Sequence, residues 1–279
     1  MARAPAKVNL WLNVVGRRAD GYHLLDSLVA FADLADTLEV APSGELSLVI
    51  DGPQAGGLGD ESDNLVLKAA RALAARSGVA PRAALKLTKN IPMAAGLGGG
   101  SADAAAALRA LIELWRVALP VEELFDLAAA LGADVPMCLA GRPAIASGVG
   151  EKLAPVTALP ECGLLLVNPG VALPTRDVFA RRTASFSPTM PAESGWPTLA
   201  DLVAALRRRG NDLTEAAVAL QPVVGDVLAV LERAPGARYV AMSGSGATCF
   251  ALFDDLAAAR KAADALPAAW WRHAGTFAP

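Results

Sequence analysis

A glycine-rich segment at residues 92–103 is the part of the sequence best suited to bind an anion. It runs Pro-Met-Ala-Ala-Gly-Leu-Gly-Gly-Gly-Ser-Ala-Asp and leads into an alanine-rich stretch in which Leu108, Leu111 and Trp115 recur at helical spacing. Glycines leave backbone N–H groups open to a ligand, and a helix N-terminus attracts negative charge. A flexible linker is the alternative. A strand directly before the segment and a helix directly after it, with Ser101 and Asp103 expected as N-cap and acidic first turn, favour phosphate binding.

The better known phosphate-binding motifs fit this segment less well. No lysine follows the glycines, so a Walker A loop is excluded. Ser101 stands where the last glycine of G-x-G-x-x-G belongs, and the sequence contains neither His-Arg-Asp nor Asp-Phe-Gly. Dinucleotide-binding and protein-kinase interpretations are therefore weakened.

The segment resembles the central motif of the GHMP kinases, in which it wraps the triphosphate of ATP. Two further segments match the same family in the expected order, Pro5–Asn9 and Ser243–Phe250, so the resemblance spans nearly the whole chain. Ala102 and Ala247 stand where many members have Ser and Gly. The resemblance implies ATP and Mg²⁺ as cofactors, with Ser101 as a possible Mg²⁺ ligand. The cofactor-binding positions it implies are Asn64, Lys89, Pro92, Gly96, Leu97, Gly98, Gly99, Gly100, Ser101 and Ala102.

Four local features narrow the resemblance to family members whose acceptor carries a cytidine diphosphate group. They are Arg18–His23, Gly132–Pro136, Pro174-Thr175 with Phe179, and Asn211–Leu213. The resemblance implies that His23 reads the edge of the cytosine while Tyr22 and Phe179 flank its ring. Ordinary packing of His23 with Tyr22 is the alternative. The substrate-binding positions implied in this way are Asn9, Tyr22, His23, Thr175, Phe179, Gly244 and Ser245.

The resemblance assigns the chemistry to Lys7 and Asp134. Asp134 would accept the proton of the acceptor hydroxyl, and Lys7 would hold that carboxylate ionised and stabilise charge on the reacting oxygens. Asp134 could instead cap a short helix at residues 135–140, since Asp is favoured at N-caps in any protein. Lys7 could be a solvated lysine on an edge strand.

Two of the implied nucleotide-binding residues have equally plausible structural roles. Asn64 directly precedes an expected helix at Leu65–Arg76 and could be its N-cap. Lys89 could merely face solvent from its strand.

The surrounding elements are predicted from hydrophobic spacing. Strands are expected at Val8–Val14, half-buried, and at Ala84–Ile91, and a helix is expected at Val121–Leu131 ending at Gly132. Two prolines in residues 154–160 suggest a domain boundary, so we expect domains at 1–155 and 156–279. The resemblance implies an α+β fold of two domains, the first like domain 2 of ribosomal protein S5 and the second ferredoxin-like.

Composition limits the partners and the environment of the chain. A net charge of −3 and a pI near 5.5 provide no basic field for nucleic acid. No apolar stretch is long enough to span a membrane. The three cysteines are widely separated and lack any C-x-x-C pairing, as expected for reduced thiols of a cytoplasmic protein. We expect a monomer or homodimer that acts on a small molecule, without nucleic acid or membrane as a partner.

Two other functions remain open from the sequence. One is a kinase of the same family that acts on a smaller alcohol, such as homoserine or mevalonate. The other is a non-catalytic protein that uses this fold to bind a nucleotide; the presence of both Lys7 and Asp134 argues against it.

Overall fold

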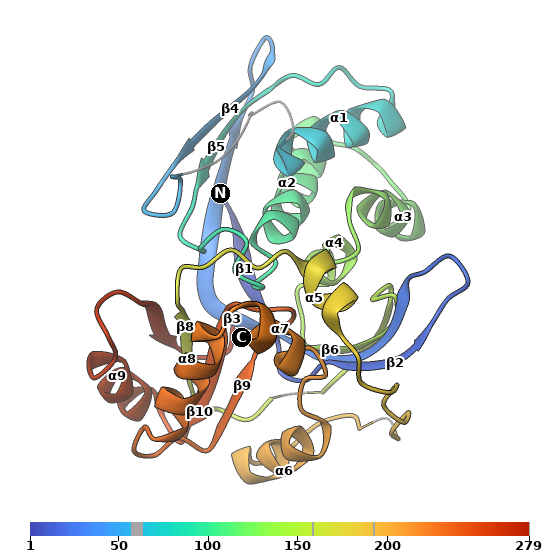
Figure 1. Cartoon of the computed structure of the whole chain (residues 1–279). Helices are drawn as coiled ribbons and strands as arrows, with labels where there is room; N and C mark the ends of the chain where they lie inside the picture. The colour runs from blue at the N-terminus through green and yellow to red at the C-terminus, as the bar shows by residue number, and fades with distance from the viewer. Residues whose placement is uncertain (57–63, 158, 192, 279) are drawn as a thin grey trace. The chain divides into compact units, whose positions relative to one another are not determined.

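The computed structural model describes residues 1–56, 64–157, 159–191 and 193–278, which divide into two compact units (Figure 1). The first unit comprises Met1–Ala6, Leu34–Met93 and Gly98–Gly141. The second comprises Lys7–Asp33, Ala94–Leu97 and Arg142–Pro279. Two strands, β1 (Ala2–Asn9) and β3 (His23–Ala41), therefore supply residues to both units.

The strands of the first unit are built around β5 (Ala83–Thr88). β5 pairs antiparallel with the end of β3 and parallel with β4 (Leu46–Asp51). Leu85 and Leu87 are buried while Lys86 is exposed, which is the alternation expected of a half-buried strand. The strand predicted at Ala84–Ile91 is thus confirmed, although it ends three residues earlier.

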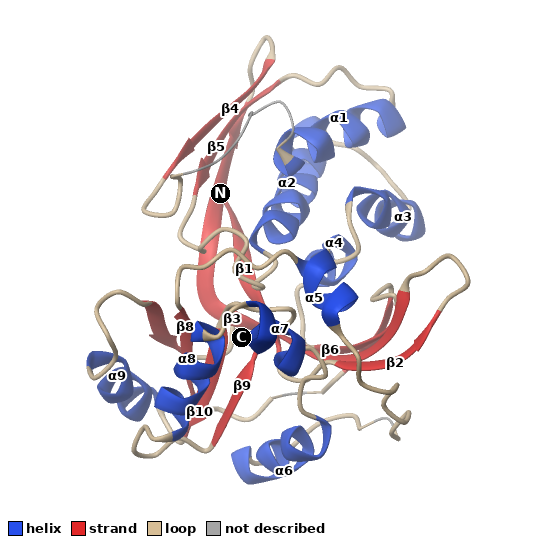
Figure 2. Cartoon of the chain, in the orientation of Figure 1, coloured by secondary structure: helices blue, strands red, loops and turns tan. Residues whose placement is uncertain are grey.

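Four helices complete the first unit and lie on one side of its strands (Figure 2). They are α1 (Leu65–Ser77), α2 (Gly99–Trp115), α3 (Val121–Leu131) and α4 (Val135–Ala140). α2 packs against both α1 and α4, and its run of small residues, Ala104–Ala107, is fully buried. The predicted helix at Val121–Leu131 is confirmed, with Gly132 as its C-cap.

The second unit contains a four-stranded antiparallel sheet in the order β11-β8-β10-β9. Its strands are β8 (Gly163–Asn168), β9 (Tyr239–Met242), β10 (Cys249–Phe253) and β11 (Trp271–Gly275). Every residue of the two central strands, β8 and β10, is buried, because α8 (Val223–Glu232) and α9 (Leu256–Asp264) pack against the sheet. Side chains of this sheet and of the helices beside it form an apolar core cluster.

The remaining elements of the second unit flank that sheet and the first part of β3. Three strands belong with β3: β2 (Asn13–Arg17), β6 (Ala144–Gly148) and β7 (Lys152–Pro155). The helices are α5 (Thr175–Arg181), α6 (Leu199–Arg209) and α7 (Thr214–Leu220).

The N-terminal strand differs from its prediction. Instead of one half-buried strand at Val8–Val14, β1 ends at Asn9 and β2 begins at Asn13, and every residue between Lys7 and Val14 is buried. In a half-buried strand, alternate positions face solvent. Asn9 and Asn13 instead make buried side-chain hydrogen bonds, to Ser27 Oγ and to the carbonyl oxygen of Arg209, so the alternation of residue types does not reflect exposure.

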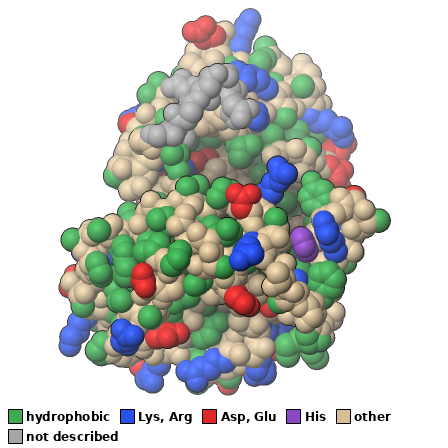
Figure 3. All heavy atoms as spheres, in the orientation of Figure 1, with side chains coloured by type: hydrophobic (Ala, Val, Ile, Leu, Met, Phe, Trp, Pro, Cys, Tyr) green, Lys and Arg blue, Asp and Glu red, His purple; other side chains and the backbone are tan. Residues whose placement is uncertain are grey.

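Surface charge and cysteine chemistry follow the composition. On the face drawn in Figure 3, basic and acidic side chains are interspersed. Within the described ranges, no helix combines the length and hydrophobicity that a membrane crossing requires. The three cysteines all lie in the described part of the chain, where they are buried and form no disulfide. Burial raises the pKa of the Cys162 and Cys249 thiols to about 12, which keeps them protonated.

Candidate active site

The glycine segment forms the start of α2 in the first unit. Gly98 is the N-cap, with φ 63° and ψ 22°, a left-handed conformation that suits glycine. The first helical bond runs from the Ala102 N–H to the Gly98 carbonyl at 2.9 Å. The N–H groups of the preceding residues therefore have no acceptor within the helix and can bind an anion.

The prediction of which residue caps this helix is wrong. Ser101 and Asp103 were predicted as N-cap and acidic first turn, yet Gly98 caps the helix and Ser101 is its third residue. Because α2 begins at Gly99, the hydroxyl of Ser101 belongs to the first turn itself, and Asp103 lies beyond it. Gly100 is exposed, and Gly98, Gly99 and Ser101 are half-buried.

A buried ion cluster lies beside the start of α2. The Lys89 ammonium forms ion pairs with Asp36 and with Asp103, the latter at 2.6 Å, and all three side chains are almost completely buried. The Asp36 carboxylate also accepts hydrogen bonds from the backbone N–H groups of Asn90 and Ile91. A Cβ atom on Gly99 would lie 3.5 Å from the Lys89 Nζ, so the cluster adjoins the glycine segment.

The Asp103 carboxyl group ionises less readily in this cluster than it does in water. Burial, with the neighbouring Asp36 carboxylate, raises the pKa of Asp103 to about 7, although the Lys89 ammonium acts against the shift. Asp103 Oδ1 is buried without a hydrogen-bond partner, whereas Asp36 has three donors. The prediction that Lys89 might face solvent is therefore wrong: its two carboxylate partners hold it inside the protein.

Asn64 and Asp134 occupy helix starts in the same unit. Asn64 caps α1, because its Oδ1 accepts a 2.8 Å hydrogen bond from the Val66 N–H, as the structural alternative predicted. Asp134 stands at the N-cap position of α4, but its side chain makes no capping hydrogen bond. The carboxylate of Asp134 is thus not used to begin the helix. The roles of both residues toward a nucleotide or an acceptor stay predictions.

In the second unit, residues 94–97 are fixed to the end of β1 and to the turn between β9 and β10. The Lys7 N–H donates to the Leu97 carbonyl at 2.8 Å, and the Thr248 N–H donates to the Ala95 carbonyl at 3.2 Å. The Ser243 hydroxyl donates to the Gly96 carbonyl at 3.3 Å. The Lys7 side chain is buried, and its ammonium donates to Asn9 Oδ1 at 2.8 Å.

The turn at Ser243–Gly246 is held by residues from two other predicted motifs. Asn211 Nδ2 lies 2.8 Å from the carbonyl oxygens of both Met242 and Gly244. The hydroxyls of Thr175 and Ser245 lie 2.8 Å apart. Residues 31 to 70 positions apart in the sequence therefore meet here. Asn211 is a supporting residue that the list of expected site residues omitted.

Gly96 allows the closest backbone approach in this region. Its φ is +74°, and a Cβ atom there would lie 2.5 Å from the Gly246 carbonyl oxygen. We expect Gly96→Ala to destabilise the protein by about 2 kcal/mol or more, because left-handed strain adds to the clash. Urea denaturation measures the loss. Gly100→Ala is the matched control, since its Cβ would meet only Leu65 Cδ1 at 3.5 Å; an unchanged midpoint for Gly96→Ala would contradict the prediction.

The residues expected around a cytosine are brought together in part. The rings of His23 and Phe179 stack with centroids 4.9 Å apart, whereas Tyr22 is 64% exposed. Partial burial, with the nearby Arg17 and Arg182 guanidinium groups, lowers the pKa of His23 below its ordinary value. The imidazole is therefore neutral at pH 7, with one hydrogen-bond donor and one acceptor.

Two family models match large parts of the sequence. The sequence model for the GHMP kinases N terminal domain matches residues 64–142, and that for the GHMP kinases C terminal domain matches residues 192–272. The chain belongs to the GHMP kinase family. The α+β GHMP kinase fold predicted from the sequence is confirmed, and the predicted domain boundary near residue 155 lies between the two matched ranges and stays a prediction.

Individual relatives of this GHMP kinase match over nearly its whole length. It is 54% identical to a 4-diphosphocytidyl-2-C-methyl-D-erythritol kinase of Paramagnetospirillum magneticum, covering 96% of this chain and 95% of that one. It is 50% identical to the protein of the same name from Granulibacter bethesdensis, covering 96% and 90%. A crystal structure of 4-(cytidine 5'-diphospho)-2C-methyl-D-erythritol kinase superposes with a TM-score of 0.83 at 39% identity, covering 99% and 98%.

A more distant neighbour shares the fold alone. The homoserine kinase of Cytophaga hutchinsonii superposes on this GHMP kinase with a TM-score of 0.67 at 19% identity, covering 98% of this chain and 92% of that one.

Proposed function

We propose that this GHMP kinase transfers the γ-phosphoryl group of ATP to the 2-hydroxyl of 4-diphosphocytidyl-2-C-methyl-D-erythritol, in the non-mevalonate route to isoprenoid precursors. The observation that carries the proposal is the identity of 54% over 96% of the chain to a relative of that name. The stacked pair of His23 and Phe179 supports it, since a neutral imidazole beside an aromatic ring suits recognition of a nucleobase.

Catalysis of phosphoryl transfer depends mainly on positioning and on electrostatic stabilisation of the reacting oxygens. In this proposal the backbone N–H groups of Gly98, Gly99, Gly100 and Ser101 hold the triphosphate. Asp134 orients the acceptor hydroxyl and accepts its proton. Lys7 supplies positive charge to the transferring oxygens, which the low dielectric of its buried position strengthens.

Mg²⁺ is part of the proposal, with few ligands from the protein. Within the described residues, no group of three or more His, Cys, Asp and Glu side chains is arranged to hold a metal ion. Mg²⁺ commonly keeps several waters and binds through substrate phosphates with one or two protein groups. The Ser101 hydroxyl, in the first turn of α2, fits the role of such a single ligand. When bound, the ion neutralises charge on the phosphate oxygens.

An ADP-release assay tests the proposed reaction directly. Purified protein, ATP and Mg²⁺ are combined with 4-diphosphocytidyl-2-C-methyl-D-erythritol, with homoserine or with mevalonate. We expect saturable ADP release with the first acceptor only, together with a new phosphomonoester signal in the ³¹P NMR spectrum of the product. Turnover of homoserine or mevalonate instead would assign another GHMP kinase activity, and ATP binding without ADP release would favour a non-catalytic nucleotide-binding protein.

His23→Ala tests how the acceptor is recognised. We expect its KM for the cytidine-bearing acceptor to rise by roughly tenfold with kcat little changed, because losing one stacking and hydrogen-bonding contact weakens ground-state and transition-state binding alike. Steady-state kinetics at saturating ATP measures this split. His273→Ala is the matched control, since the other histidine of the chain pairs with Asp33 at 2.9 Å. An unchanged KM in His23→Ala would argue for an acceptor without a base.

A further inference from the structure

A continuous series of buried hydrogen bonds leads from a backbone carbonyl to the Lys7 ammonium. The Ser27 hydroxyl donates to the carbonyl oxygen of Trp11 at 2.6 Å and accepts from Asn9 Nδ2 at 2.7 Å. Asn9 Oδ1 in turn accepts from Lys7 Nζ at 2.8 Å. Ser27, Asn9 and Lys7 are all buried, and all belong to the second unit.

The direction of this series is fixed at both ends. A carbonyl oxygen only accepts and an ammonium only donates. The single hydroxyl proton of Ser27 is used on Trp11, so Ser27 must accept from Asn9, and the Asn9 amide must turn its NH₂ toward Ser27. The oxygen of that amide is thereby directed at Lys7. The order of donors and acceptors leaves one orientation of Asn9 that satisfies every group.

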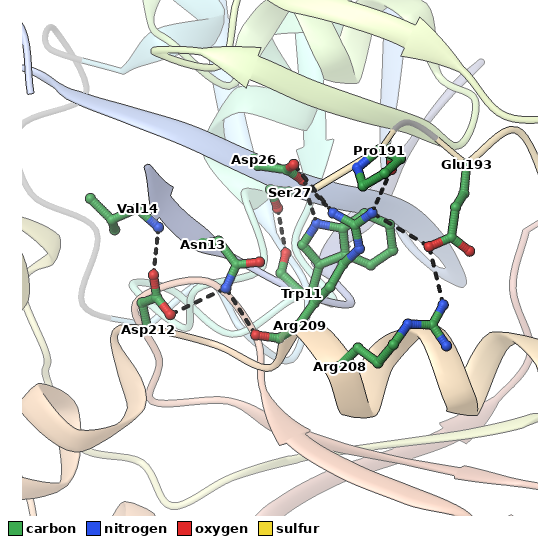
Figure 4. Close-up of polar contacts among 10 residues, drawn as sticks. All are labelled: Trp11, Asn13, Val14, Asp26, Ser27, Pro191, Glu193, Arg208, Arg209 and Asp212. Atoms are coloured by element: carbon green, nitrogen blue, oxygen red, sulfur yellow. Dashed lines mark hydrogen bonds and ion pairs between the residues drawn. The ribbon is translucent and has the colours of Figure 1, made fainter. Parts of the chain in front are cut away.

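The far end of the series is rigidly anchored (Figure 4). The Trp11 indole donates to Asp26 Oδ1 at 2.8 Å, and the Arg209 guanidinium lies over its ring at 4.3 Å. Arg209 also bonds Asp26 at 3.2 Å and the Pro191 carbonyl at 2.9 Å. The rings of Trp196 and Trp11 are nearly perpendicular, with centroids 5.7 Å apart. Ser27 therefore bonds to a carbonyl whose residue is held on several sides.

Asn9 is also held through its backbone. Its N–H donates to the Ser243 hydroxyl at 3.1 Å, and Ser243 in turn donates to the Gly96 carbonyl. The backbone of Asn9 is thus fixed by the turn between β9 and β10, while the orientation of its side chain depends on Ser27.

We propose that Ser27 is a positioning residue for Lys7: through the amide of Asn9 it sets where the Lys7 ammonium lies. This inference rests on the proposed function, in which Lys7 acts on the transferring phosphoryl group. Ser27 itself touches neither ATP nor acceptor in this scheme. Its removal would leave the Asn9 NH₂ and the Trp11 carbonyl buried without their partner, and Asn9 would turn to relieve this, carrying its oxygen away from Lys7.

Ser27→Ala is expected to lower kcat by on the order of 10- to 100-fold, since small displacements of a group in a phosphoryl-transfer site cost rate. The KM values for ATP and acceptor should stay within about twofold. Ser27→Thr, which keeps the hydroxyl, should retain kcat within a few fold. Ser47→Ala, at an exposed serine of β4, is the control for a serine removed from a strand.

A double-mutant cycle separates positioning from general loss of structure. If Ser27 acts through Asn9, then Ser27→Ala should change kcat by less than about twofold in an Asn9→Ala background. Multiplying effects of the two substitutions would overturn the inference, as would a wild-type kcat in Ser27→Ala. Should Ser27→Ala fail to fold, Ser27→Cys replaces it, because the thiol keeps the volume but is a poor hydrogen-bonding group; equal kcat values in Ser27→Cys and Ser27→Thr would then overturn the inference.

The wild-type assay distinguishes the inference from the function on which it rests. If the wild type phosphorylates a different acceptor, the proposed substrate is wrong, and the same variants are compared with that acceptor, because the inference concerns Lys7. If the wild type turns over the cytidine-bearing acceptor and Ser27→Ala does so equally well, the inference alone is wrong. A wild type that releases no ADP with any acceptor overturns both.

Discussion

Asp134→Asn is expected to lower kcat by roughly 10²- to 10⁴-fold, the usual contribution of a general base. An amide cannot accept the proton of the acceptor hydroxyl, although it can still hydrogen-bond to it. The KM values should change little, because the lost interaction belongs to the transition state. The measurement is ADP release at saturating ATP and acceptor, with thermal melting to show that the fold is kept.

This substitution also separates catalysis from helix capping. Asn and Asp are about equally good at N-caps, and the Asp134 side chain makes no capping bond to α4, so a loss of kcat could not be attributed to the start of that helix. Asp126→Asn, at an exposed position of α3 eight residues earlier, is the matched control. A decrease below tenfold in Asp134→Asn would mean that Asp134 orients the hydroxyl rather than deprotonating it, as a loose transition state allows.

Local patterns in the sequence predicted the elements whose signals lie close together along the chain. The helix at Val121–Leu131 has the bounds expected of it, and the helix starting at Leu65 is capped by Asn64. The turn at Ser243–Gly246 connects two strands, as its glycines and serines indicate. In each case a cap, a turn or a periodic apolar face is specified by residues within a few positions of one another.

Such local patterns could not predict which polar side chains are buried. Lys89 and Asp36 are 53 residues apart in the sequence, and Asn9 and Ser27 are 18 apart. The residues next to a lone lysine or asparagine in a strand do not indicate its hydrogen-bond partner, so each was expected to face solvent or ligand. Burial became favourable only because the fold brings a matching donor or acceptor to each of them. Asn9, expected to contact the substrate, has internal partners for both ends of its amide.

Ser27, Asp36 and Asn211 are the residues around the candidate site that the list of expected residues omitted. Residues 23–41 mix Asp, Ser and Thr with apolar residues without a clear period, and this segment forms the longest strand, β3, with 19 residues. Residues two positions apart lie on the same face of a strand. Ser27 has Leu25 and Val29 at these positions, and Asp36 has Leu34 and Leu38, which was the available signal that both are buried.

Lys89→Met is expected to destabilise the protein by about 3–5 kcal/mol, because it removes the cation from a buried cluster and leaves two carboxylates without it. Asp36 keeps its hydrogen bonds from the Asn90 and Ile91 N–H groups. Asp103 Oδ2 loses the hydrogen bond from Lys89, and Asp103 Oδ1 has no hydrogen-bond partner. Urea denaturation at pH 8 measures the loss. Lys86→Met is the matched control: it lies three residues earlier on β5 and pairs with Asp51 at the surface, so the midpoint should hardly move.

The pH dependence of the free energy of unfolding tests whether the pKa of Asp103 is raised in the folded protein. In the unfolded chain the Asp103 carboxyl ionises near its ordinary pKa of 3.8, whereas in the folded protein its pKa is about 7. Between these values the unfolded chain has released a proton that the folded protein still holds, so rising pH favours unfolding. Relative to Asp103→Asn, which lacks this group, the wild type should therefore lose stability from about pH 4 to pH 7 and change little above. A difference that grew in the opposite direction would mean that the attraction of Lys89 outweighs burial and lowers the pKa of Asp103. A Lys89→Met variant as stable as Lys86→Met would mean that the charge on Lys89 is not what compensates the two carboxylates.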